Sequence, residues 1–429
     1  MIAANIGKIF LDAYNEKFGS NYTAKVFFVE KYFPVFFDHE KYMQWVINSP
    51  FVQGLKKGVA PTSVERKVKL EVLVNKISTS DADASIAIGF PSLDVLATTS
   101  GQITNLCLPL REEEMYQSWI GSSFGIGVQG GLCILFDNPQ ILLDLFDGWE
   151  LYRDFLNTTS TLKGNQINNW NGQWLAHRYN IRTYDEFNPT ASFNPIGTGK
   201  EGGLEVKSES WSKVLLGIAQ NYPDTQMTSY VYSLVKVNIT VGFIPFELPR
   251  IRKPYELYSR YFSSKKLEDV ENLFGTAIGF QTACEMGVIG ANALEPKGFK
   301  NYINNGVVPK YNENDEEKTI NFNTYQIWLL AMLNNEQLWE KAQDIAATLS
   351  NYSKTDRDLR TKKSQEITNL LTSVNKKQFI ESLIEIVKES PETDQLAEIA
   401  EIIHTMPIDN VPYFLTLIRF QYAVANKKS

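Results

Sequence analysis

The sequence predicts an α+β protein, with a mixed α/β N-terminal domain followed by a C-terminal antiparallel helical bundle. Strand-like and helix-like patterns, with many glycines, alternate along the first part of the chain. A polar stretch rich in Asn and Gly follows, and after it only apolar stripes at helical spacing recur. A chain of 429 residues also exceeds one average domain. The expected division is a domain over 1–295, a linker or surface loop over 296–323, and a bundle over 324–429.

Periodic patterns predict the elements of the first domain. Residues 24–37 are dense in aromatic and β-branched side chains, which predicts a buried extended element that Pro34 interrupts. Residues 64–77 place apolar side chains at helical spacing with charges between them, which predicts an amphipathic helix. The later patterns predict, in order, a short buried strand over 132–136, a helix over 141–156, one or two strands over 229–246, and a connector marked by Pro245, Pro249 and Pro254.

Four apolar stripes predict the helices of the bundle. Side chains three and four positions apart share a face within 367–374, 379–387, 396–403 and 414–422. Short loops separate these stretches, which favours an antiparallel arrangement.

Composition restricts the class of function. A net charge of −7 argues against a free-standing, non-specific nucleic-acid binder, which usually has a basic surface. Three widely spaced cysteines and three histidines, with no Cys-x-x-Cys pair, argue against a zinc site. The N-terminus shows no signal-peptide pattern, and no window of eighteen residues is apolar and uncharged. We therefore expect a cytoplasmic protein without a metal or cofactor.

The most informative local feature is the stretch from Lys163 to Arg178, which combines amides, two tryptophans and cations with almost no carboxylate. Amides both donate and accept hydrogen bonds, and an indole offers a stacking face with one donor. This mixture favours recognition of a flat, polar, anionic ligand such as nucleic acid or carbohydrate. Trp170 and Trp174 would share a face on a helix, where core packing explains them as well as base stacking does.

Two other segments contain residue types found in phosphate-binding or metal-dependent catalytic sites. Residues 122–131 are glycine-rich but precede a strand and lack the lysine of a phosphate-binding loop, which favours a tight turn or a close backbone approach. Glu205 and Lys207 are similar to the Glu-x-Lys end of a metal-dependent nuclease site, in which carboxylates hold a divalent ion and a lysine assists the attacking water. Asp185 and Glu186 could supply a further ligand, and an ordinary solvated strand explains the same residues.

The order of these features resembles the large subunit of a type I CRISPR interference complex, often called Cascade. The resemblance runs along nearly the whole chain, through 125–136, 165–174, 238–245 and 412–420. It implies a non-catalytic subunit whose N-terminal domain helps to recognise the protospacer-adjacent motif and whose bundle holds the displaced strand. Guide pairing reads the target sequence in such systems, so a few polar side chains suffice for the protein's part.

The resemblance also implies partners and contacts. The partners are the other CRISPR complex subunits, a guide RNA, target double-stranded DNA bound through the assembly, and a recruited helicase-nuclease that makes the cut. The side chains expected to contact the motif or duplex are Lys163, Asn165, Gln166, Asn168, Asn169, Asn171 and Gln173, followed by Gln129 and Gln102. Those expected to contact phosphates of the displaced strand are Arg357, Arg360, Lys362 and Lys363, for which a solvated face is the other explanation.

Two alternatives stay open. The first is a magnesium-dependent defence or restriction nuclease centred on Glu205 and Lys207. The second is a structural protein with an aromatic face that binds carbohydrate or peptide, which accounts for the tryptophans only.

Overall fold

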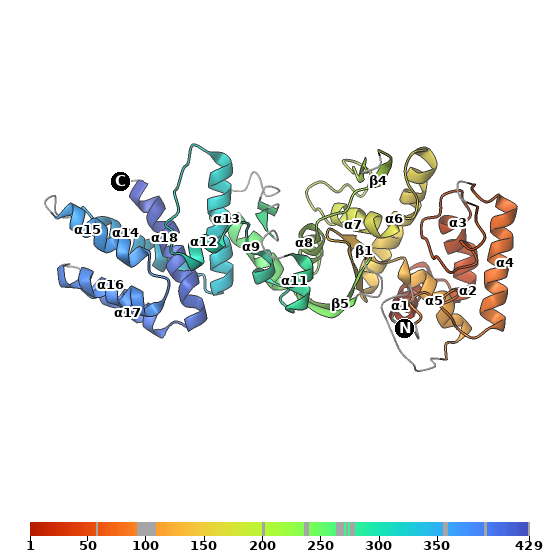
Figure 1. The fold of residues 1–429 in the computed structure, drawn as a ribbon, viewed down its shortest axis with the longest axis horizontal. Coiled ribbons are helices and arrows are strands. Elements are labelled where there is room, and N and C mark those ends of the chain that lie inside the picture. The colour runs from red at the N-terminus through yellow and green to blue at the C-terminus, as the bar shows by residue number, and fades with distance from the viewer. Residues whose placement is uncertain are drawn as a thin grey trace. The chain divides into compact units, whose positions relative to one another are not determined.

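The computed structural model describes residues 1–56, 59–91, 109–199, 202–235, 240–262, 270–271, 273–274, 279–354, 359–389 and 393–427. The chain is an α+β protein with a C-terminal helical region, as the sequence predicts (Figure 1). It forms two compact units, one of Met1–Leu248 with Cys284–Gly287 and the other of Pro249–Ala283 with Val288–Ser429. The main division thus lies at Leu248, upstream of the expected boundary at residue 295.

The first unit begins with helices where the sequence predicts an extended element. Residues 24–37 form α2 (Ala24–Phe27), the π-helical segment η1 (Phe28–Tyr32) and α3 (Phe33–Phe36), so that prediction is wrong. The ring centroids of Phe28 and Tyr32 lie 5.1 Å apart, and those of Tyr32 and Phe36 lie 4.2 Å apart, both pairs stacked. Aromatic side chains spaced by four residues line one face of a helix, and this spacing outweighed strand propensity.

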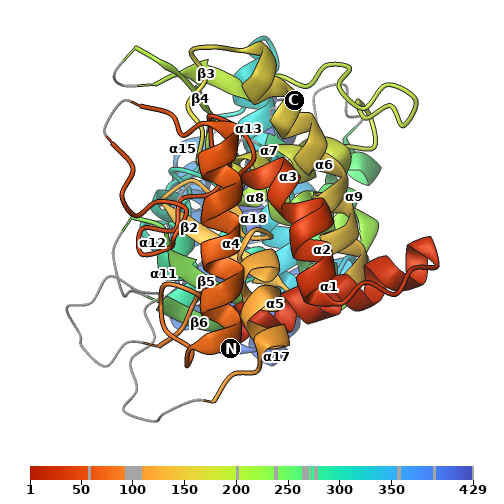
Figure 2. The ribbon, with the colours of Figure 1, turned by 90° about the vertical axis from the view of Figure 1, so that its right-hand side faces the viewer.

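The helix predicted over 64–77 is confirmed as α4 (Ser63–Thr79), in which Leu73 and Ile77 are buried, whereas Val64 and Val68 of the expected apolar face are exposed. The start of α4 is fixed by a capping box, in which the Thr62 hydroxyl accepts from the Glu65 backbone N–H and the Glu65 carboxylate accepts from the Thr62 N–H. Figure 2 looks onto this unit, where α4 runs vertically. The unit also contains α1 (Ile2–Phe18), which packs against α5 (Glu112–Ser122).

An antiparallel sheet forms the other half of the first unit. Its order is β1-β2-β5-β6, with β1 (Ile126–Val128), β2 (Leu132–Phe136), β5 (Gln226–Ser233) and β6 (Thr240–Glu247). The buried strand predicted over 132–136 and the strands predicted over 229–246 are therefore confirmed. Val231 lies opposite Ile134, which places strands nearly one hundred residues apart side by side.

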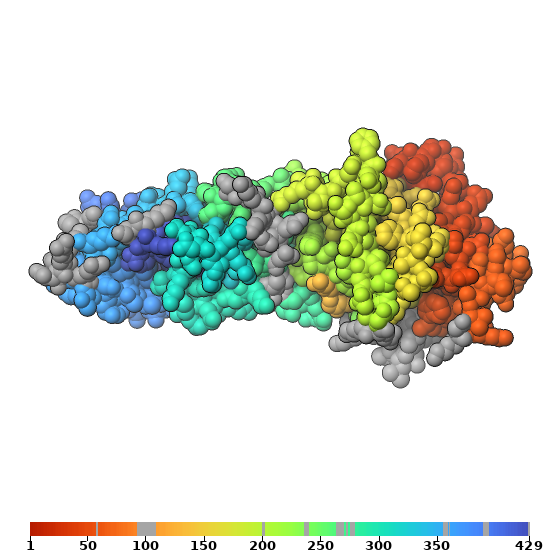
Figure 3. Space-filling model, turned by 90° about the horizontal axis from the view of Figure 1, so that it is seen from above, coloured from red at the N-terminus to blue at the C-terminus, as the bar shows by residue number. Residues whose placement is uncertain are grey.

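Three helices and a small hairpin complete the first unit. The predicted helix over 141–156 is confirmed within α6 (Pro139–Thr158), and α7 (Ile167–Arg178) and α8 (Trp211–Asn221) follow. The hairpin pairs β3 (Ile196–Thr198) with β4 (Leu204–Val206). The segment between α7 and β3 projects from the surface, in yellow-green at the upper edge of Figure 3.

The second unit is helical in its described part. The four predicted stripes are confirmed as α15 (Arg360–Leu371), α16 (Lys376–Glu389), α17 (Thr393–Thr405) and α18 (Val411–Lys427). Two further helices precede them, and α18 packs against both. They are α13 (Glu316–Leu333) and α14 (Gln337–Tyr352).

Two stretches expected to be irregular are partly helical. The expected linker over 296–323 contains α12 (Lys300–Asn304) and the first two turns of α13. The expected connector is largely helix α9 (Leu248–Tyr261), with Pro254 inside it. The remaining elements of the described residues are short: α11 (Phe280–Glu285), η2 (Ala291–Leu294) and η3 (Ile408–Asn410).

A buried guanidinium fixes the ends of several segments in the helical unit. Arg419 donates to the carbonyl oxygens of Leu371, Ser373 and Tyr302. Burial lowers the pKa of Arg419 to about 10. The arginine thus satisfies carbonyl groups that a helix end leaves without partners.

Candidate functional site

The stretch 163–178, which the sequence singles out for ligand contact, consists of a short loop followed by α7. Both of its tryptophans are buried. The Nε1 of Trp170 donates to the Gly148 carbonyl at 2.8 Å, and that of Trp174 donates to the Asp144 carbonyl at 2.7 Å. With their indole donors satisfied by α6, these rings pack in the core and are not exposed for base stacking.

Two amides of α7 bond to the start of the sheet. The Nδ2 of Asn171, which is fully buried, donates to the carbonyl oxygens of Ser123 at 2.7 Å and Gly125 at 3.0 Å. The Nδ2 of Asn168 donates to the same Gly125 oxygen at 3.0 Å and lies 3.6 Å from the Cys133 sulfur. Burial raises the pKa of the Cys133 thiol to about 12. Asn168, which is half-buried, and Asn171 therefore anchor α7 to the start of the sheet.

The glycine-rich segment is the surface on which α7 lies. A Cβ atom on Gly172 would sit 2.3 Å from the Gly127 carbonyl oxygen, and one on Gly125 would sit 2.4 Å from the Asn168 Nδ2. A larger side chain would require the backbone to move at Gly172 and the Asn168 and Cys133 side chains to move at Gly125. The close backbone approach that the sequence favours over a phosphate loop is thus made within the chain.

Three further amides hold the β3–β4 hairpin. The Oε1 of Gln166 accepts from the Val206 N–H at 2.9 Å, and the Nδ2 of Asn169 donates to the Val206 carbonyl at 3.3 Å. The Nε2 of Gln173 donates to the Lys207 carbonyl at 3.1 Å. Five of the seven side chains expected to contact DNA therefore bond to the backbone of their own unit.

The other two residues of that set, with Gln129, lie at the surface. Lys163 and Asn165 are exposed, and the Lys163 Nζ lies 4.0 Å from the Glu205 carboxylate. The Asn165 N–H donates to the Tyr42 carbonyl at 2.7 Å, which ties this loop to the segment after α3. Gln129 is exposed in the turn between β1 and β2.

The cations expected to contact the displaced strand belong to the second unit. Lys362 is exposed and lies 3.8 Å from Glu366, whereas Lys363 is 6% exposed, with its Nζ 4.9 Å from the centre of the Tyr352 ring. Arg360 begins α15. Arg357, like Gln102 of the first unit, lies outside the described residues.

The nuclease hypothesis centres on the β3–β4 hairpin. Glu205 lies opposite Gly197, and Lys207 follows the strand with its N–H donating to the Pro195 carbonyl. Across the described ranges, no three or more His, Cys, Asp or Glu side chains form a group that could hold a metal ion. The charge beside Glu205 is the Lys163 ammonium.

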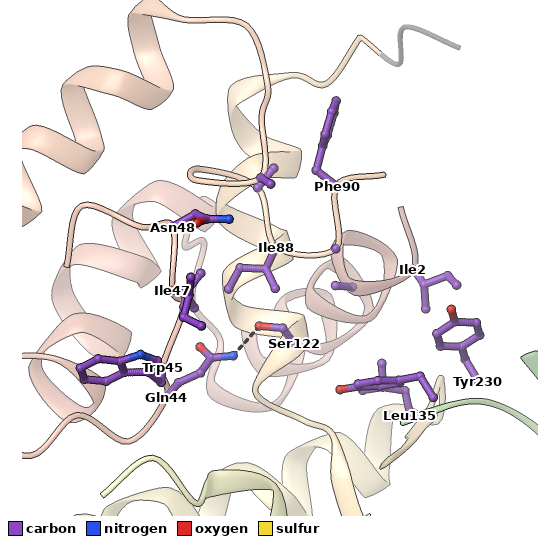
Figure 4. A pocket seen from close by; sticks show the side chains of 16 residues that line it. Ile2, Gln44, Trp45, Ile47, Asn48, Ile88, Phe90, Ser122, Leu135 and Tyr230 are labelled. Atoms are coloured by element: carbon purple, nitrogen blue, oxygen red, sulfur yellow. Dashed lines mark hydrogen bonds between the residues drawn. The ribbon is translucent and has the colours of Figure 1, made fainter. Parts of the chain in front are cut away.

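The structure reveals a different candidate site, a pocket with a cavity volume of about 310 Å³ (Figure 4). That volume lies within the range of small-molecule sites, about 300–1,000 Å³. One wall is the segment 44–48, which we call the Gln44–Asn48 segment. The other lining residues are Ile2, Ala3, Ala84, Ala87, Ile88, Gly89, Phe90, Ser122, Leu135, Tyr230 and Tyr232.

Hydrogen bonds hold the Gln44 amide at the pocket floor. Its Nε2 donates to the Ser122 hydroxyl at 2.8 Å, and its Oε1 accepts from the Tyr32 hydroxyl at 2.8 Å. The Tyr32 oxygen also lies 2.5 Å from that of Ser123, and burial raises the pKa of Tyr32. An amide nitrogen has two hydrogens, so Gln44 keeps one donor beyond its bond to Ser122.

The chain just before the segment is clamped to α6. Arg153 is buried and donates to the carbonyls of Val35 at 2.7 Å and Lys41 at 3.0 Å. The Lys41 Nζ donates in turn to the Thr159 carbonyl at 2.8 Å. Burial lowers the pKa of Arg153 to about 10, which still leaves it charged at neutral pH. These bonds fix the position of the pocket wall without any contribution from a ligand.

The lining chemistry suits binding. Trp45, which is 45% exposed, offers an indole ring at the rim, and Asn48 is an exposed amide. Among the residues that the structure describes, those lining the pocket include no carboxylate, histidine, lysine or arginine. The site can therefore stack a flat ligand and bond to its polar edge.

Sequence reasoning missed this pocket although a signal was present. Gln44 and Asn48 flank Trp45 in five residues, the same mixture of amides and indole as in α7. The segment follows the aromatic run 24–37 and has no helical or strand period of its own. Loops positioned by a rigid scaffold often contain binding residues. The polar and aromatic composition of this irregular segment could therefore have identified it as a candidate binding loop.

Comparison with known proteins gives no family assignment. No protein-family model matches the chain, and neither curated proteins nor solved structures yield a match. Among the described residues, no helix is sufficiently long and apolar to span a membrane.

Proposed function

We propose that the protein is a non-catalytic large subunit of an RNA-guided DNA-targeting antiviral complex, which acts in the cytoplasm. In this proposal it helps to recognise the protospacer-adjacent motif and to hold the displaced strand. Its partners are the other complex subunits, guide RNA and target DNA, and a recruited helicase-nuclease. The observation that supports it best is the pocket of the Gln44–Asn48 segment, where hydrogen bonds fix the Gln44 amide and the Trp45 indole and Asn48 amide are exposed beside it.

The pocket has the chemistry that recognition of a short DNA motif needs. Asn and Gln side chains can pair with the edge of a base through donor and acceptor together. An aromatic ring such as Trp45 stacks on the face of any unpaired base, and this contact is worth about 1–3 kcal/mol. Because guide pairing reads most of the target, a single pocket of this size is enough for the subunit's share.

The charge of the chain fits a subunit better than a free-standing DNA binder. With a net charge of −7, it gains little from phosphate neutralisation over its whole surface. The other subunits would supply most backbone contacts. Of the two described lysines expected at the displaced strand, only Lys362 is exposed at the surface. We propose Lys362 as a phosphate contact and assign no such role to Lys363.

The first test is gentle affinity purification of the tagged protein from its host, followed by sequencing of the RNA that co-purifies. We expect small RNAs with a constant flank and a variable centre. Purification of the protein without RNA would contradict the proposal. The isolated protein would then be tested for magnesium-dependent cleavage that Lys207→Ala abolishes, the result that the nuclease hypothesis requires.

The second test concerns the pocket. Binding of the purified assembly to a matched duplex is measured by mobility shift for Trp45→Ala and for Trp45→Phe. We expect Trp45→Ala to weaken binding roughly tenfold and Trp45→Phe to retain most of it, because phenylalanine keeps a stacking face. Equal binding by the wild type and both variants, with the RNA still present, would show that the pocket does not contact DNA. The proposal that the protein belongs to an RNA-guided assembly would remain supported.

A further inference from the structure

The segment between α7 and β3 presents an aromatic side chain to solvent. Phe187 is 98% exposed, which makes it the most exposed large apolar side chain among the described residues. Ile181, earlier in the same segment, is 74% exposed. Full exposure of a phenylalanine leaves its apolar surface in water and marks it as a candidate contact residue. We call residues 180–194 the Phe187 loop; it belongs to the yellow-green projection of Figure 3.

The base of the loop is held by aromatic and hydrogen-bond contacts. The His177 ring stacks on Phe193 with centroids 4.6 Å apart, and its Nε2–H donates to the Pro189 carbonyl at 2.9 Å. Phe193 also packs edge-on against Trp170 and Trp174 at 5.2 and 5.7 Å. Both ends of the loop are thereby attached to the same buried cluster.

A second brace holds the first half of the loop. The Arg178 guanidinium donates to the Tyr184 hydroxyl at 3.1 Å and lies over its ring. Asp144 and Asp147 pair with this guanidinium at 2.8 and 3.2 Å. The ion pairs fix Arg178, and Arg178 in turn fixes Tyr184, which directly precedes Asp185 and Glu186.

Local turns define the tip itself. The Asp185 carboxylate accepts from the Phe187 N–H at 2.9 Å, and the Asn180 carbonyl accepts from the Tyr184 N–H at 2.9 Å. Such side-chain-to-backbone bonds set a turn without help from a partner. Because the loop is ordered before binding, insertion of Phe187 would cost little conformational entropy.

The charge around the tip decides between two kinds of partner. Asp185 and Glu186 directly precede Phe187, and both are exposed. Two carboxylates beside an inserting ring would repel the phosphates of DNA or RNA. The same carboxylates would attract lysine or arginine at the rim of a protein pocket. The geometry therefore favours a protein partner over nucleic acid.

We propose that Phe187 is an anchor residue that inserts into an apolar, basic-rimmed pocket of a partner protein. A rigid aromatic side chain in such a pocket dominates many interfaces, with truncation to alanine costing about 2 kcal/mol or more. The acidic residues before it orient the encounter and suppress binding to nucleic acid. This interface is separate from the Gln44–Asn48 pocket and holds whether or not that pocket binds DNA.

The test places a photo-crosslinking benzoylphenylalanine at position 187 in the full chain, expressed in its host. The purified material is irradiated, and the adduct is identified by mass spectrometry of the joined peptides. We expect one protein adduct, with Lys or Arg next to the crosslinked position of the partner. The same probe at Phe18, which is exposed at the end of α1 with the Lys17 ammonium beside its ring, is the control and should not give this adduct.

Substitutions then test the role of the side chain. Phe187→Ala should lower recovery of the crosslinked partner at least tenfold, and Phe187→Trp should preserve it. Glu186→Lys should also weaken recovery, most strongly at low salt. Unfolding midpoints should not change, because the ring is in water. An adduct on nucleic acid or on a second copy of this chain, no adduct, or unchanged recovery with Phe187→Ala would each overturn the proposal.

Discussion

Two segments of the first unit combine amides with tryptophan, and the structure uses them in opposite ways. In α7 the Asn171 amide and both indoles face the core, where backbone carbonyls occupy their donors. In the Gln44–Asn48 segment the Trp45 ring and the Asn48 amide reach the surface beside a pocket. The same residue types therefore serve as scaffold in one segment and as a candidate recognition surface in the other. The difference lies in which hydrogen-bonding groups are already satisfied.

The comparison predicts that substitutions in α7 act on stability and that substitutions in the pocket act on binding. The largest expected effect is that of Asn171→Asp, which keeps the side-chain shape but replaces a buried donor by a carboxylate. The new charge would face the carbonyls of Ser123 and Gly125. We expect a loss of about 4 kcal/mol in the free energy of unfolding, because a buried charge without a partner is costly. Urea denaturation measures it.

Asn165→Asp is the matched control, since it makes the same chemical change in the same stretch at an exposed position. It should change stability by less than about 0.5 kcal/mol. If the two variants were equally stable and only Asn171→Asp lost DNA binding, α7 would act in binding and not as scaffold. The stretch 163–178 would then be the recognition element.

A smaller effect is expected from Gly172→Ala. The added methyl would press on the Gly127 carbonyl oxygen, where α7 crosses β1. Alanine improves helix propensity, yet the forced separation should still cost about 2 kcal/mol net. Thermal and urea unfolding of the variant test this expectation. A stabilised variant would mean that α7 is not tightly seated on the sheet.

Acid should weaken the aromatic cluster that includes α7. Burial lowers the pKa of His177, so the folded state prefers its neutral form. The stability that depends on neutral His177 is complete above about pH 6.5 and is lost as pH falls through the range between the unfolded and folded pKa values. Urea unfolding at pH 7.5 and 5.5 measures the loss, which should be smaller than that of Gly172→Ala. His177→Phe should reduce it, while His39, whose pKa burial also lowers, keeps a remaining part.

The smallest effect on stability is expected in the pocket. Trp45 is half exposed, so Trp45→Ala should change the free energy of unfolding by less than about 1 kcal/mol. A variant that loses binding but keeps its stability would differ from the α7 variants, which are expected to lose stability. A destabilisation as large as that of Gly172→Ala would instead make the indole part of the core.

Regular periodicity made most elements predictable. The helices after residue 360 repeat a helical period, residues 132–136 form a short continuous apolar run, and residues 229–246 alternate loosely; all are confirmed as elements. Residues 24–37 were mispredicted because their composition favours a strand while the spacing of Phe28, Tyr32 and Phe36 favours a helix. In that conflict the packing of the rings decided the structure.

The candidate site was less predictable than the fold. Its walls come from α1, the Gln44–Asn48 segment, residues 84–90 and strands β2 and β5, which are far apart in sequence. No local pattern reveals that these segments meet. In α7, likewise, the carbonyl groups that accept from Asn168 and Asn171 lie more than forty residues away. Composition could therefore suggest a site but not show that these amide donors were already paired.

The reactivity of the Cys133 thiol can be used to measure how often the sheet of the first unit opens. The thiol lies buried on β2 beside the Asn168 amide, and its raised pKa of about 12 keeps it protonated at neutral pH. A protonated, inaccessible thiol does not react with an alkylating reagent until the strand separates from α7. The rate at which the Cys133 peptide gains mass therefore counts openings of the sheet. The alkylation rate of Cys133 therefore gives the free energy of unfolding of the first unit separately from that of the helical unit.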